Sequence, residues 1–148
     1  MRLFLDANVL FTAAVSPTGA SAGLIALAEA GGCELVSSTL AVAEATRNLR
    51  ATAPAAMDRW GVVDTVVGIV PEGDPRLLMR VDVVLEAKDR PILAAALGCR
   101  ATVLVTGDRR YFGPLFGRAI GGTVVVPPRE ALDRLLAGLG RERDDVGR

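Results

Sequence analysis

The sequence contains no histidine in its 148 residues, and this absence excludes several kinds of site. Ser-His-Asp and Cys-His catalysis both need an imidazole, as does every histidine-ligated metal centre. The two cysteines, Cys33 and Cys99, lie far apart without CxxC spacing, so we expect buried thiols and no zinc site. Any chemistry must therefore rely on carboxylates, hydroxyls, Arg and Lys.

The chain also has no net charge and no long apolar run. Its 17 basic residues balance 17 acidic ones, so the whole molecule lacks the basic field that dominates nucleic-acid binding. No run approaches the roughly 20 apolar residues of a membrane-spanning helix, and Asp6 interrupts the opening segment MRLFLDANVL. We therefore expect a cytoplasmic protein without membrane contact.

About half of the residues are apolar, which is enough for one domain with a sizeable core. We expect this domain to span residues 1–140, with residues 141–148, RERDDVGR, as a solvated tail.

Apolar runs and turn signals alternate along the chain in the manner of short strands and helices. Residues 76–87 fit either state. The expected strands are 2–5, 33–38, 66–70, 101–106 and 122–128, and the expected helices follow Asp6 and Asp89 and span 21–30, 40–49, 54–64 and 129–139. This alternation predicts an α/β fold with a mostly parallel sheet and helices on both faces. Ligands of such sheets bind beyond the carboxyl ends of the strands.

Four acidic residues occupy informative places in this pattern. Asp6 and Asp108 follow expected strands, Asp89 begins an expected helix, and Glu44 lies on a helix among apolar neighbours. Taken singly, they could be helix caps, a turn residue and a solvated charge. Gathered together they would repel, by about 4 kcal/mol for two charges ~4 Å apart at an effective dielectric near 20, unless a cation held them. Oxygen ligands of this kind suit Mg²⁺ or Mn²⁺.

In this order and spacing, the four segments resemble the motifs of the PIN domain family of metal-dependent nucleases. The resemblance covers nearly the whole chain and rests on LFLDANVL, AEATRNL, KDRPILAAAL and LVTGDRRYFG. It implies a three-layer α/β/α sandwich and an endonuclease acting on single-stranded or structured RNA. The implied Mg²⁺ or Mn²⁺ ligands and catalytic residues are Asp6, Glu44, Asp89 and Asp108, supported through hydrogen bonds by Asn8 and Thr106.

One position departs from the family pattern, because Arg110 stands where many small members place a further acid. This departure implies one strongly held metal and a second that joins only with substrate. Many compact bacterial members are toxins inhibited by a small antitoxin protein, and small domains of this type often pair, so an antitoxin partner and a homodimer are expected.

Four arginines near the acids are candidates for binding RNA phosphates through bidentate contacts, with solvated helix surface as the alternative reading. They are Arg47, Arg90, Arg109 and Arg110. Aromatic residues are scarce, and we expect Trp60, Tyr111 and Phe112 to pack in the core and not to stack on bases.

Other functions fit the sequence less well. A receiver-like phosphoacceptor domain needs adjacent acids after the first strand and an aspartate after the third, where this chain has a single Asp6 and Pro71. An aspartyl-nucleophile phosphohydrolase needs a second Asp two residues after the first, where this chain has Asn8. Dinucleotide binding fits poorly because no GxGxxG motif follows the first strand. A silent PIN-like scaffold that binds RNA or protein without cutting remains open.

Overall fold

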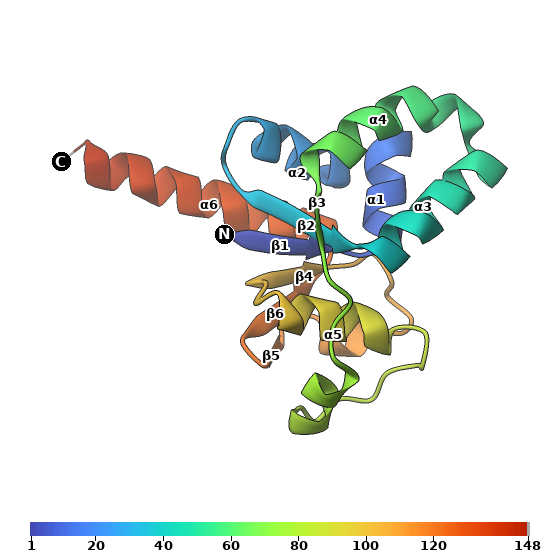
Figure 1. The fold of residues 1–148 in the computed structure, drawn as a ribbon. Coiled ribbons are helices and arrows are strands. Elements are labelled where there is room, and N and C mark those ends of the chain that lie inside the picture. Colours follow the sequence, from blue (N-terminus) through green and yellow to red (C-terminus); the bar gives the residue numbers. More distant parts are fainter. Residues whose placement is uncertain (148) are drawn as a thin grey trace.

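The computed structural model describes residues 1–147, and a six-stranded sheet forms its centre (Figure 1). The strand order is β3-β2-β1-β4-β6-β5, in which all neighbours are parallel except β5 and β6. The strands are β1 (Arg2–Leu5), β2 (Glu34–Ser38), β3 (Gly68–Val70), β4 (Val103–Val105), β5 (Ala119–Ile120) and β6 (Thr123–Val126). The predicted mostly parallel sheet is confirmed.

The two central strands form the core of the sheet. Leu3, Phe4 and Leu5 of β1 are completely buried, and the residues of β4 are buried as well. Parallel strands covered on both faces need continuous apolar runs instead of alternating ones, which explains the sequences RLFL and VLV.

Helices cover both faces of the sheet and complete the three-layer α/β/α arrangement predicted from the sequence (Figure 1). Helices α1 (Ala7–Val15), α2 (Ala20–Glu29) and α6 (Pro128–Val146) pack on one side, with α3 (Thr39–Thr52) and α4 (Met57–Val66) against α1. Helix α5 (Arg90–Gly98) lies on the other side, as expected when the chain crosses back from β3 to β4 through a right-handed connection.

No single helix in the described part of the chain is long and apolar enough to cross a membrane, and α1 with α2 passes that test only as a pair bent by 89°.

The ambiguous segment 76–87 contains one short 3₁₀ helix and then irregular chain. The 3₁₀ helices are η1 (Pro54–Ala56), η2 (Pro75–Arg80) and η3 (Gly113–Leu115). Residues 81–86 form neither helix nor strand, and a turn at residues 87–89 then leads into α5.

Two features differ from the sequence prediction. The short antiparallel strand β5 joins β6 through Gly121 and Gly122, which both have positive φ, as tight hairpin turns require. The last helix also runs beyond its expected end at residue 139, because α6 continues through Val146 with exposed side chains in its final turns. Arg and Glu are good helix formers, so the charged segment extends the helix. Arg148 lies outside the described residues, and the domain limit at residue 140 stays a prediction.

Candidate active site

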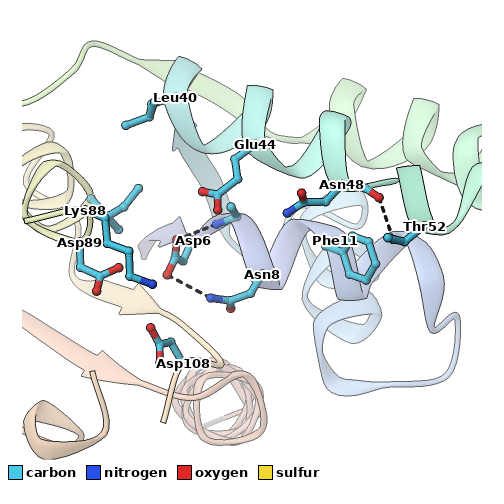
Figure 2. Close-up of a pocket in the computed structure, with 12 residues that line it drawn as sticks. Asp6, Asn8, Phe11, Leu40, Glu44, Asn48, Thr52, Lys88, Asp89 and Asp108 are labelled. Atoms are coloured by element: carbon cyan, nitrogen blue, oxygen red, sulfur yellow. Dashed lines mark hydrogen bonds between the residues drawn. The ribbon is translucent and has the colours of Figure 1, made fainter. Parts of the chain in front are cut away.

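The four predicted acids line one cavity of about 390 Å³ at the carboxyl ends of the central strands (Figure 2). Asp6 follows β1, Asp108 follows β4, Asp89 precedes α5 and Glu44 projects from α3. Four segments far apart in the sequence therefore meet because β1 and β4 are parallel neighbours with helices on either side.

Asp6 is buried and its carboxylate is fixed by three hydrogen bonds. Oδ1 accepts from the backbone N–H of Ala7 at 2.7 Å, so Asp6 also caps the start of α1. Oδ2 accepts from the Thr106 hydroxyl at 2.9 Å and from Asn8 Nδ2 at 3.1 Å. The carboxylate therefore has a defined orientation in the cavity.

Asn8 and Thr106 connect the ends of β1 and β4 around this carboxylate. Asn8 Nδ2 also donates to Thr106 Oγ1 at 3.3 Å, and Asn8 Oδ1 accepts from the backbone N–H of Gly107 at 2.7 Å. Thr106, which is fully buried, accepts from the N–H of Asp108 at 3.2 Å. This network holds Asp6 and the turn that carries Asp108 in register.

Asp89 does not play the capping role that a helix start suggests. It occupies the N-cap position of α5, yet its side chain accepts no capping hydrogen bond. Its Oδ2 is buried and has no hydrogen-bond partner within residues 1–147. A buried carboxylate oxygen without a partner is costly, so this atom is a candidate ligand for a cation or water.

Asp108 and Glu44 have more ordinary surroundings. Asp108 is half-buried, and its Oδ1 accepts from the backbone N–H groups of Arg110 and Tyr111, both at 3.1 Å, so the side chain also shapes its own turn. Glu44 is exposed on α3 and faces the cavity (Figure 2).

The cavity perturbs the protonation of its buried acids. The pKa of Asp6 is raised from 3.8 to about 6. Burial is the largest cause and the charges of Asp89 and Glu44 add to it, while the hydrogen bonds from Thr106 and Ala7 act in the opposite direction. Burial also raises the pKa of Asp89, while the positive charge of Lys88 lowers it and the other acids raise it. The carboxylates therefore act on one another electrostatically.

The carboxylate oxygens of the four acids are the kind of ligand that a divalent cation prefers, although the acids do not surround a single point. Within residues 1–147 no three Asp, Glu, His or Cys side chains converge closely enough to hold an ion together. Mutual repulsion separates carboxylates that have no cation between them. Mg²⁺ typically uses only one or two carboxylates and fills its shell with water and substrate phosphate, so an open oxygen-lined cavity suits it.

The four candidate arginines fall into two groups. Arg109 and Arg110 line a second cavity that shares Asn8, Lys88 and Asp108 with the first. Arg47 instead lines a depression on another face of α3, and Arg90 at the start of α5 borders neither cavity. Of these four, Arg109 and Arg110 thus line a cavity that adjoins the acid cavity.

Three polar residues that line the first cavity, Lys88, Asn48 and Thr52, were not expected from the sequence. Lys88 borders both cavities, and its ammonium lies 4.4 Å from the centroid of the Tyr111 ring, which Arg110 also approaches at 5.1 Å. We expected Tyr111 to pack in the core, but it is only partly buried, whereas Phe112 and Trp60 are buried as expected. Asn48 and Thr52 line the first cavity and lie four and eight residues after Glu44, a helical spacing that could have found them.

These features define an α/β protein with a carboxylate-lined cavity at the carboxyl edge of a parallel sheet. A family model for the PIN domain matches residues 2–110. The chain belongs to the PIN domain family, whose members are nucleases that generally use divalent metal ions.

The fold is similar to that of a chain in a solved structure, the crystal structure of VapBC2 from Rickettsia felis bound to a DNA fragment from their promoter. The TM-score is 0.61 at 14% identity, over 86% of this chain and 98% of that chain. At this identity the likeness shows the fold alone. No curated protein matches the chain in sequence.

Proposed function

We propose that the protein is a Mg²⁺- or Mn²⁺-dependent endoribonuclease that hydrolyses RNA phosphodiester bonds. The observation that carries this proposal is the buried Oδ2 of Asp89, which has no hydrogen-bond partner among residues 1–147 and belongs to a residue that lines one cavity with Asp6, Glu44 and Asp108. An oxygen in this state gains most from a cation or from a cation-bound water.

Asp6, Glu44, Asp89 and Asp108 would hold the ion. When bound, the ion would lower the pKa of a water molecule and offset negative charge on the reacting phosphate. The hydrogen bond from the Thr106 hydroxyl fixes the orientation of the Asp6 carboxylate, so Asp6 would present its oxygens to the ion in a defined direction. Asp89 Oδ2 has no hydrogen-bond partner in residues 1–147, so Asp89 could hold the ion or accept a proton from the attacking water.

The second cavity would hold the phosphates next to the cleaved bond. Lys88, Arg109 and Arg110 line it, and Lys88 stands where it joins the acid cavity. Guanidinium groups bind phosphate oxygens in pairs, and the ammonium of Lys88 adds a point charge. This local cationic patch supplies the attraction that a chain with zero net charge otherwise lacks. Arg47 and Arg90 would contact only RNA that extends beyond the two cavities.

RNA cleavage with controlled metal tests this proposal. Purified protein should cut a single-stranded RNA in Mg²⁺ or Mn²⁺, and EDTA should stop the reaction until metal is restored. Electrophoresis of end-labelled RNA would show the products. Cleavage that continues unchanged after exhaustive chelation would contradict the role of the ion.

A silent scaffold that binds RNA or protein is the second candidate, because no three acids converge in the described part of the chain. Retention of RNA without any product across a full titration of both metals would favour the scaffold over the nuclease.

We also propose a toxin role with a small antitoxin partner, in the cytoplasm and as a homodimer. The support is the shared fold with a chain of the VapBC2 structure. Induced expression in bacteria should arrest growth, and the Asp89→Asn variant should not. Equal growth of cells that express either protein would speak against a toxin and would leave the nuclease proposal standing.

A further inference from the structure

One face of helix α3 continues the acid cavity well beyond Glu44. The lining residues of this helix recur at every fourth position, and successive ones lie above one another on a helix surface. They are Leu40, Glu44, Asn48 and Thr52. At 1.5 Å per residue this stripe is roughly 18 Å long, so the cavity extends past the space that the carboxylates need.

The end of the cavity near Thr52 has a different chemistry from the acid end. Here Phe11 of α1 faces Asn48 and Thr52 of α3, whereas Asp89 and Asp108 lie at the opposite end (Figure 2). The residues at this end carry no charge. They offer an aromatic ring, an amide and a hydroxyl.

Phe11 differs from the aromatic residues of the core. Phe4, Phe112 and Trp60 are buried, whereas Phe11 is only partly buried and lines the cavity. A ring in this position can pack against a flat ligand while its other side contacts the core.

Asn48 has hydrogen-bonding groups to offer a ligand. It is exposed, and its backbone carbonyl accepts from the Thr52 hydroxyl at 2.7 Å, which leaves the side-chain amide out of that bond. The amide carries both a donor and an acceptor, a pair that matches the edge of a nucleobase.

We propose that Phe11 and Asn48 form a nucleobase-binding subsite, next to the acids, for one nucleotide of a single-stranded RNA. A nucleotide joins a charged phosphate to a flat base with a hydrogen-bonding edge, and the cavity places matching groups in that order. Single-stranded RNA is recognised by stacking on aromatic rings and by hydrogen bonds to base edges. The cavity volume of about 390 Å³ lies within the range of small-molecule sites.

The inference rests on the proposed nuclease for its substrate class, so its test must not depend on cleavage. Nucleoside 5′-monophosphates meet this condition because they contain no phosphodiester bond. Their binding in Mg²⁺ is measured by isothermal titration calorimetry, with ribose 5-phosphate as the ligand that lacks a base.

We expect at least one nucleotide to bind the wild-type protein at least about fivefold more tightly than ribose 5-phosphate, as stacking on one ring allows. Phe11→Leu should remove most of this advantage for every base. Asn48→Ala, at an exposed helical position, should weaken the preferred base by roughly two- to tenfold and flatten the selectivity. Thr46→Ala, on another face of α3, is the matched control and should change nothing. Circular dichroism confirms that each variant is folded.

Three results would overturn the subsite. They are equal binding of ribose 5-phosphate and all four nucleotides, no detectable binding of any of these ligands, and unchanged nucleotide affinities in Phe11→Leu and Asn48→Ala. RNA cleavage by a protein that fails this test would leave the nuclease intact. Base-dependent binding that both variants lose, in a protein that does not cleave RNA, would support the subsite and refute the nuclease.

Discussion

The buried carboxylate of Asp6 should make the stability of the protein fall as the pH rises. Burial raises its pKa from 3.8 to about 6, so the folded state binds the proton more tightly than the unfolded chain does. Each pKa unit corresponds to about 1.4 kcal/mol, so ionised Asp6 costs the folded state about 3 kcal/mol. For a raised acid pKa, stability is greatest below the unfolded value and is lost as the pH rises towards about 6.

The Asp6→Asn variant isolates this effect, because it removes the titrating group and keeps a side-chain oxygen to accept from Ala7. Urea unfolding in EDTA at pH 4.5 and pH 8 gives the free energy of unfolding of both proteins. Wild type should lose about 2 kcal/mol more than Asp6→Asn between these two pH values. An equal change in both proteins, or a larger loss in the variant, would refute the reasoning.

The same urea titration, repeated with Mg²⁺ in place of EDTA, tests whether a cation binds beside Asp6. A cation beside Asp6 favours its ionised form, so 10 mM Mg²⁺ should shrink the difference between the two proteins at pH 8. A difference that does not respond to Mg²⁺ would argue against binding at this carboxylate.

Two further predictions follow from the surroundings of the site. Lys88→Met removes the charge that lowers the pKa of Asp89, so the acidic limb of the pH profile of kcat/KM should move to higher pH, and Lys88→Arg should restore it. An acidic limb that stays at the same pH in Lys88→Met would contradict an effect of the Lys88 charge on the pKa of Asp89. Gly73→Ala would drive its Cβ into the backbone of Ala94 in α5 and should lower the free energy of unfolding by at least about 1–3 kcal/mol. Gly98→Ala meets only ordinary contacts at 3.5 Å and should have a much smaller effect in the same urea titration, so equal losses would contradict the packing argument.

The sheet and the positions of the acids could be predicted because they depend on short-range patterns. A continuous apolar run such as Val103–Val105 has few alternatives to a buried parallel strand. An acid that directly follows such a strand must lie at its carboxyl edge, as Asp6 does. The order of motifs then located the acids of the other segments.

Features that depend on tertiary packing were not predicted. Lys88 follows the irregular segment 81–86, which has no periodicity from which the direction of a side chain could be read. Arg47 lies only three residues after Glu44 but faces a different depression. By contrast, the strand β5 and the lining residue Asn48 had readable signals in the Gly-Gly turn and in the four-residue spacing along α3.

RNA cleavage by Asp89→Asn tests the central claim most directly. This substitution keeps the size of the side chain and replaces only the carboxylate whose Oδ2 is buried without a partner in the part of the chain that the structure describes. Cleavage of a single-stranded RNA in Mg²⁺ or Mn²⁺ should fall by at least about a hundredfold, as expected for the loss of a group that handles a proton in the reaction, while circular dichroism shows a folded protein. Cleavage at the wild-type rate by folded Asp89→Asn would contradict the assignment of this cavity as the active site.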